Sequence, residues 1–225
     1  MHLLVVEDYD ALSQMAARLL DDALRAQPHA SLVLPTGNTP LGLYRELAAL
    51  HARGAFDTAR LRVFQLDEYL GVAPDDPRSF YRWIRRVVLD PLGISEERVV
   101  RLRGDAPDPD AACRAYDAAV RDAGGFDLVV LGLGGNGHLG FNEPPADPAS
   151  PTRVPSYAVT CGMANILAAR RKLLLVSGAE KRDALRRALD GPVSPESPAS
   201  YLQHSGHVTV IADAAAWPWP QRVGA

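Results

Sequence analysis

The residues best suited to chemistry stand in positions 127–144, which read D-L-V-V-L-G-L-G-G-N-G-H-L-G-F-N-E-P. His138 lies within a cluster of five glycines, and Glu143 follows it before a proline. An imidazole changes its charge between about pH 5 and pH 8, so it can act as a base, and a carboxylate can orient it. A lone histidine is usually a satisfied loop residue and a lone glutamate a cap. Their joint position among glycines that permit close backbone approach favours a functional interpretation.

A second acidic pair, Asp67 and Glu68, follows the strand-like residues 61–66. Adjacent residues of an extended chain point to opposite faces, so only one of the two carboxylates should enter a given pocket. A carboxylate placed there can take a proton from a carbon beside a carbonyl if its pKa is tuned. Read in isolation, the pair is better explained as an acidic cap of the following turn.

A third loop has the sequence P-T-G-N-T-P, with Thr36, Gly37, Asn38 and Thr39 at its centre. Its backbone N–H groups and hydroxyls at a helix start can hold an anion such as phosphate. The loop lacks the lysine of a Walker motif, so it does not indicate a nucleoside triphosphate. The alternative is a plain turn in which Thr39 is the N-cap and Pro40 the first helical residue, and the loop alone slightly favours it.

The glycine cluster also fits G-x-G-x-x-G at residues 132–137, so a dinucleotide site has to be weighed. That fingerprint requires a helix opening from the loop and an acidic residue about 20 positions later. Pro144 blocks a long helix, and residues 153–161 contain no Asp or Glu. We therefore consider the match fortuitous.

These loops follow strand-like segments that alternate with helical ones. Strands are predicted at residues 3–6, 31–34, 61–66, 128–131, 173–176 and 208–212. Helices are predicted at residues 11–25, 40–50, 79–89, 111–123, 163–169 and 180–189. The alternation predicts an α/β fold: a single domain over residues 1–225, with a doubly wound, mostly parallel, Rossmann-like sheet and helices on both faces. The three loops then lie at carboxyl ends of strands, where such sheets bind ligands.

Composition agrees with one core and excludes several classes. The chain has 225 residues, 47% apolar residues and a net charge of -3, so it has no overall basic field for nucleic acid. Two cysteines, one in a helical pattern, argue against a disulfide framework. No apolar run reaches membrane-spanning length, and the N-terminus does not resemble a signal peptide. We expect a soluble cytoplasmic protein with no nucleic-acid or membrane partner.

The chain resembles the glucosamine-6-phosphate deaminase family over nearly its whole length, in T-G-N-T-P-L-G-L-Y, L-D-E-Y and above all G-N-G-H-L-G-F-N-E-P. S-G-A-E-K and P-A-S-Y-L-Q-H-S-G-H-V-T-V add to the match. The related 6-phosphogluconolactonases are similar in fold, in the threonine-glycine loop and in the S-G-x-x-K element. Their glycine-histidine loop does not continue as F-N-E-P, and that continuation favours the deaminase.

The resemblance implies conversion of glucosamine 6-phosphate and water to fructose 6-phosphate and ammonia, without a metal or an organic cofactor. It implies that His138 opens the sugar ring, that Asn136 and Glu143 orient its imidazole, and that Asp67 moves a proton from C2 toward C1. It assigns the phosphate of this small-molecule substrate to Thr36, Gly37, Asn38, Thr39 and Lys181. It leaves open the oligomeric state, allosteric control and the stereochemistry of the amino sugar, so a galactosamine phosphate is also possible.

Asn136 departs from the aspartate that many members of that family carry. Asparagine keeps the orienting hydrogen bond but lacks the negative charge that favours a protonated imidazole. We predict that Asn136→Asp retains activity with a shifted pH profile of kcat/KM. A folded but inactive variant would contradict this interpretation.

A second departure follows Val154, where the family continues through a longer, arginine-bearing lid and this chain passes directly to Pro155. The region near residues 145–157 is therefore a shortened lid, or a mobile segment is missing from the sequence. An intact mass clearly above 24.3 kDa would establish the latter. A true loss predicts weaker substrate binding and a more water-exposed site.

Two further functions remain as alternatives. A sugar-phosphate lactonase would use the same phosphate loop for ester hydrolysis and release no ammonia. A non-catalytic sugar-phosphate sensor would keep the loop and Lys181 but would not need Asp67, His138 and Glu143 together.

Overall fold

The computed structural model describes residues 1–219 and is built around one parallel sheet. Its seven strands lie in the order β1-β9-β8-β6-β2-β3-β5. All neighbouring strands in this sheet are parallel. The bounds are β1 His2–Val6, β2 Ser31–Leu34, β3 Arg62–Gln65, β5 Val99–Val100, β6 Leu128–Gly132, β8 Arg171–Val176 and β9 Val208–Asp213.

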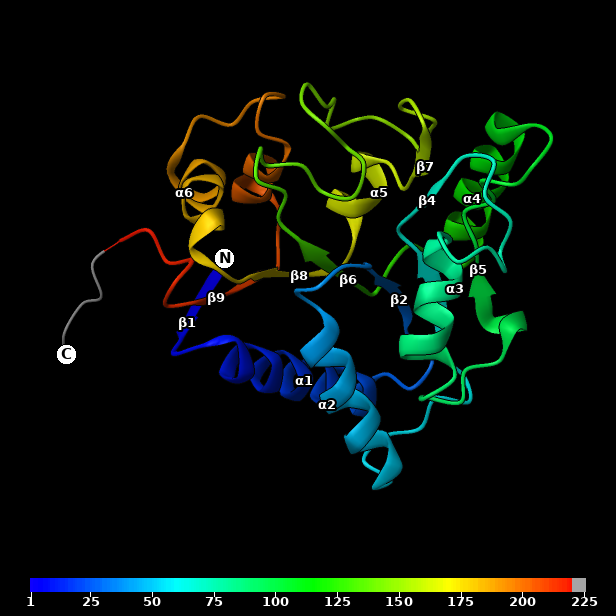
Figure 1. Cartoon of the computed structure of the whole chain (residues 1–225), viewed down its shortest axis with the longest axis horizontal. Coiled ribbons are helices and arrows are strands. Elements are labelled where there is room, and N and C mark those ends of the chain that lie inside the picture. Colours follow the sequence, from blue (N-terminus) through cyan, green and yellow to red (C-terminus); the bar gives the residue numbers. More distant parts are fainter. Residues whose placement is uncertain (220–225) are drawn as a thin grey trace.

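The central strands read as continuous apolar runs because both of their faces are buried. In β2, Val33 belongs to one core cluster, whereas Leu32 and Leu34 belong to the other. The first cluster contains residues of α4 (Pro109–Asp122), α5 (Met163–Ala168) and α6 (Arg182–Asp190). The second contains residues of α1 (Tyr9–Ala26), α2 (Leu41–Ala52) and α3 (Phe80–Ile84). Figure 1 shows α1 and α2 on one side of the sheet and α5 and α6 on the other, which confirms the doubly wound prediction.

The direction in which successive strands are added to the sheet changes between β2 and β6, which are hydrogen-bonded neighbours. From β2 the sheet continues outward through β3 and β5, and from β6 it continues the other way through β8 and β9. Loops that leave the carboxyl ends of β2 and β6 therefore diverge and leave a crevice at this switch point. The threonine-glycine loop follows β2 and the glycine-histidine loop follows β6.

Several elements differ from the sequence-based prediction. Asp67 and Glu68 were expected in a loop, but they form β4 (Asp67–Tyr69), which pairs antiparallel with β7 (Ala158–Thr160) in a second, two-stranded sheet. Short helical turns add η1 (Arg85–Leu89), η2 (Glu96–Arg98), η3 (Ala179–Lys181) and η4 (Pro198–His204). The first of these, η1, is a π-helical turn that continues α3.

The predicted cap of α2 was wrong. The helix begins at Leu41, Pro40 takes the N-cap position, and no side chain caps it. The reason is a tertiary contact: Tyr9 of α1 accepts a hydrogen bond from the Gly42 N–H at 2.8 Å and donates one to the Asn38 carbonyl at 2.9 Å. A residue distant in sequence thus satisfies the helix start, and Thr39 is released from that role.

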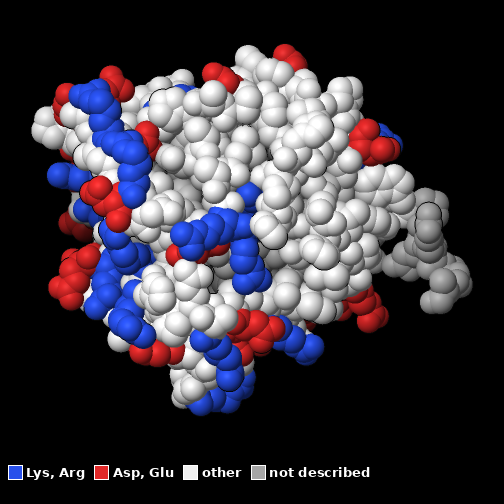
Figure 2. All heavy atoms as spheres, turned by 180° about the vertical axis from the view of Figure 1, so that it is seen from behind, with Lys and Arg blue, Asp and Glu red and all other residues white. Residues whose placement is uncertain are grey.

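The surface bears on the class of partner. Figure 2 shows that, on the face opposite to that of Figure 1, basic and acidic side chains lie close together and large areas carry neither. The basic side chains gather mainly along the left side of this view, with acidic side chains among them. Within residues 1–219, no helix is both long and apolar enough to cross a membrane.

Candidate active site

A cavity of about 460 Å³ opens at the switch point, and it brings most of the predicted site together. The loops after β2, β3, β6 and β8 all contribute to its lining. Seven of the nine predicted residues line it: Thr36, Gly37, Asn38, Thr39, Asp67, His138 and Lys181. The other two, Asn136 and Glu143, do not line the cavity but contact His138.

The His138 imidazole is held from one side by two acceptors. Its Nδ1 lies 2.8 Å from Oδ1 of Asn136 and 2.8 Å from Oε1 of Glu143. Asn136 in turn donates from Nδ2 to Oε2 of Glu143 at 2.6 Å, which fixes the orientation of its amide. Because both neighbours of Nδ1 are acceptors, Nδ1 carries the proton and Nε2 is left to accept one. The geometry fixes the orientation of the imidazole and directs Nε2 away from both acceptors.

Gly134 is required by the position of this ring. A Cβ atom at Gly134 would lie 2.4 Å from both Cε1 and Nδ1 of His138, so any side chain would displace the imidazole. The same loop is pinned from α6, where Arg187 donates to the Gly135 carbonyl at 2.8 Å. Gly134 therefore serves close packing against the imidazole.

The two adjacent carboxylates have separate environments, as alternation along a strand predicts. Asp67 lines the cavity, is 7% exposed, and its Oδ1 has no hydrogen-bond partner among the described residues. Burial raises the pKa of Asp67 to about 7, and the negative charge of Glu68 adds to the shift. A buried carboxyl group with a free oxygen and a pKa near neutrality has the properties of a general base.

Glu68 points away from the cavity and caps the start of α3. Its two oxygens accept hydrogen bonds from the Ser79 hydroxyl at 2.7 Å and from the N–H groups of Phe80 and Tyr81, both at 3.0 Å. The Tyr69 N–H and the Gln65 side chain donate to it as well. The capping interpretation therefore holds for Glu68, whereas the pocket interpretation holds for its neighbour.

A contact with α2 fixes the start of the threonine-glycine loop. The buried Tyr44 hydroxyl of α2 donates to the Pro35 carbonyl at 2.7 Å. Gly37 has a φ of 107°, a conformation that side chains rarely adopt. Lys181 reaches the same cavity from the turn after β8. A loop of this kind at a helix start, with an ammonium group lining the same cavity, can hold a phosphate.

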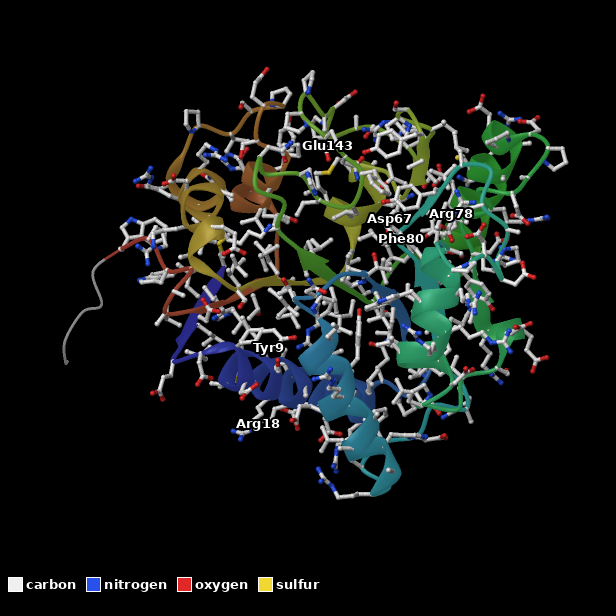
Figure 3. The ribbon with its side chains drawn as sticks, viewed as in Figure 1. Tyr9, Arg18, Asp67, Arg78, Phe80 and Glu143 are labelled. Atoms are coloured by element: carbon white, nitrogen blue, oxygen red, sulfur yellow. The ribbon has the colours of Figure 1, made fainter. Side chains whose placement is uncertain are left out.

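Sequence reasoning did not identify an aromatic wall of the cavity. Tyr69, Phe80 and Phe141 line it. The rings of Phe80 and Phe141 stack at 5.9 Å, and Tyr157, 61% exposed, packs edge-on against Phe141 at 5.7 Å. Figure 3 shows Phe80 beside Asp67. Tyr69 and Phe141 stand inside the quoted motifs, whereas Phe80 has no sequence signal.

No group of three or more His, Cys, Asp or Glu side chains within residues 1–219 is arranged to hold a metal ion. The groups that line the cavity include an imidazole, a buried carboxyl group with a raised pKa and a glycine-containing loop at a helix start.

Known proteins resemble this chain over nearly its whole length. A family model described as glucosamine-6-phosphate isomerases/6-phosphogluconolactonase matches residues 7–211. A glucosamine-6-phosphate deaminase of Streptomyces coelicolor is 41% identical over 238 residues, covering 96% of this chain and 91% of that protein. Since that alignment is longer than the 225-residue chain, the relative carries internal residues that this chain lacks.

Solved structures extend the comparison. A monomeric glucosamine-6-phosphate deaminase superposes with a TM-score of 0.92 at 35% identity, covering 96% of this chain and 98% of that one. A 6-phosphogluconolactonase from Trypanosoma cruzi has a TM-score of 0.79 at 24% identity, covering 96% and 95%, which is a likeness of fold alone.

Proposed function

The chain belongs to the glucosamine-6-phosphate isomerase/6-phosphogluconolactonase family, and we propose that it converts glucosamine 6-phosphate and water to fructose 6-phosphate and ammonia. One observation carries this proposal. A buried carboxyl group with an unpartnered oxygen, Asp67, shares one cavity with an imidazole whose Nδ1 is held by two acceptors. Isomerisation at a carbon beside a carbonyl needs such a carbon base, whereas hydrolysis of a lactone does not.

The residues act in sequence on the bound sugar. His138 accepts the proton of the C1 hydroxyl through Nε2, and the ring oxygen leaves C1 and takes up a proton, giving the open-chain aldehyde. Asp67 removes the proton at C2, the electron pair of the broken C–H bond forms the C1–C2 double bond, and the carbonyl π electrons move to O1, which takes up a proton. Asp67 then returns its proton to C1, while the nitrogen lone pair forms the C2–N double bond. Water adds to the resulting imine at C2, and ammonia departs to leave the ketone. Asn136 and Glu143 keep the imidazole in the required tautomer throughout.

Thr36, Gly37, Asn38, Thr39 and Lys181 bind the phosphate in this proposal. Binding energy from this non-reacting group holds C1 and C2 against the two bases, which raises the rate of the chemical steps.

Lys181→Ala is expected to raise the KM for glucosamine 6-phosphate by roughly tenfold or more, because it removes a charge-assisted hydrogen bond. Steady-state kinetics measures the change. The matched control is Arg182→Ala, since the neighbouring Arg182 is an exposed cation that binds the Ala215 carbonyl. An unchanged KM in Lys181→Ala would remove this lysine from the phosphate site.

The reaction itself is tested by measuring ammonia and fructose 6-phosphate released from glucosamine 6-phosphate by the purified protein. The two products should appear in equal amounts, and kcat/KM should fall below pH about 7, because protonated Asp67 cannot accept the C2 proton. Hydrolysis of 6-phosphogluconolactone without ammonia release from glucosamine 6-phosphate would establish the lactonase alternative instead.

We also propose that residues 145–157 are a shortened lid within a single sugar-phosphate domain. The Streptomyces protein carries internal residues that this chain lacks, as a shortened segment requires. A cytoplasmic location is part of the same proposal, because Cys113 and Cys161 are both free thiols.

A further inference from the structure

A second cavity of about 670 Å³ lies on the outer side of α3 and η1, away from the residues of the first. Four arginines line it: Arg82, Arg85 and Arg86 from the continuous segment of α3 and η1, and Arg101 from the residue after β5. Three carboxylates, Asp75, Asp90 and Glu96, share the lining. The proposed reaction uses none of these residues, so their convergence needs its own explanation.

The carboxylates neutralise the arginines unequally. Arg85 forms ion pairs with two of the three carboxylates, Glu96 at 2.6 Å and Asp90 at 3.6 Å. Within the described residues, no carboxylate oxygen lies within 4.0 Å of Arg82 or Arg86, and Arg82 donates only to a backbone carbonyl of Asp75. Two exposed guanidinium groups therefore remain at the cavity without an ionic partner.

The planar guanidinium group of Arg101 is held in one orientation by an aromatic ring. Its guanidinium lies over the Tyr81 ring at 4.5 Å, which fixes the plane of the group. Its buried Nε has no hydrogen-bond partner in the described chain, and the nearest carboxylate oxygen, on Asp105, is 3.6 Å from its terminal nitrogen. Stacked guanidinium groups with unused donors are well suited to bind phosphate oxygens.

The backbone here is also unusual. Arg85 and Arg86 open the π-helical turn η1 (Arg85–Leu89), a conformation that is rare in proteins and is frequently found at functional sites. Both arginines line the second cavity.

We propose that this second cavity is a binding site for a phosphate-bearing small molecule, held by Arg82, Arg86 and Arg101. The cavity is larger than the first, so a phosphorylated metabolite fits it. The site borders α3, whose residues Phe80 and Tyr81 face the first and second cavities respectively and both bind Glu68. A ligand bound there is therefore next to the helix that positions the acidic pair.

Titration calorimetry with inorganic phosphate, at low ionic strength, tests this site. The starting protein is Lys181→Ala, in which the first site is weakened. We expect it to retain phosphate binding, and we expect Arg86→Ala added to it to weaken that binding by roughly tenfold or more. Arg101→Lys, which keeps the charge but loses the fork, should weaken it as well.

Arg78→Ala is the matched control, because Arg78 is an exposed arginine of the same region that is already paired with Asp76 at 2.7 Å. Phosphate binding unaffected by Arg86→Ala, or weakened equally by Arg78→Ala, would overturn the proposal. The experiment is separate from the proposed function: if Lys181→Ala leaves substrate KM unchanged, the first phosphate site fails, and the arginine variants still decide the second.

Discussion

Asp67→Asn should abolish most of the activity and at the same time stabilise the protein. The variant lacks the proposed carbon base, so we expect kcat for ammonia release to fall by roughly a hundredfold to ten-thousandfold. The amide preserves the size of the side chain, so the cavity keeps its shape. Both products should be lost together, since the same proton transfer precedes both.

The gain in stability follows from the raised pKa. Asp67 has a folded-state pKa of about 7 against an ordinary value of 3.8, so the folded protein holds this proton more tightly than the unfolded chain. The cost of ionising the buried group therefore grows as the pH rises from about 4 to 7 and is constant above that. Removing the charge should recover up to about 4 kcal/mol in the free energy of unfolding at pH 8, and less at pH 5.

Urea unfolding of both proteins at pH 5 and pH 8 measures this difference, because all other titrating groups cancel in the comparison. A variant that is inactive but less stable than the parent at pH 8 would show that Asp67 supports the fold and is not a strained catalytic group. Such an exchange of stability for activity is common at functional sites.

Local sequence determined much of the candidate site. Asn136, His138 and Glu143 lie within one loop, so their spacing alone indicated that they could meet. The alternation of Asp67 and Glu68 indicated that one would enter a pocket, although not which one. That choice depends on Ser79 and α3, which provide donors to the second carboxylate only after the chain has folded.

Long-range contacts explain what the sequence did not indicate. In the pairing of β4 with β7, Asp67 lies opposite Thr160. The irregular, proline-rich segment that leads to β7 gives no strand signal in the sequence. The start of α2 depends on Tyr9 of α1 and not on the adjacent Thr39. The arginine-lined cavity could not be predicted from local sequence, because Arg101 reaches it from beyond β5, whereas Arg82, Arg85 and Arg86 lie on α3 and η1.

Glu68→Gln should have the opposite effect on stability from Asp67→Asn. Five donors surround the two oxygens of Glu68, and at least two of them contact each oxygen. In Glu68→Gln, an NH2 group replaces one of the two oxygens. This group cannot accept hydrogen bonds, so the donors that face it lose their acceptor. Leaving buried donors unpaired costs about 1–3 kcal/mol each, so we expect a loss of about 3 kcal/mol or more in the free energy of unfolding.

The same substitution should move the activity profile in a defined direction. The charge of Glu68 contributes to the raised pKa of Asp67, so its removal lowers that pKa. The acid limb of kcat/KM should then shift to lower pH, with the maximal rate per folded molecule reduced less than in Asp67→Asn. Glu97→Gln, at an exposed glutamate, is the control for a general loss of charge. An acid limb that stays in place, or moves to higher pH, would mean that Asp67 does not set it, and the assignment of Asp67 as the carbon base would fail with it.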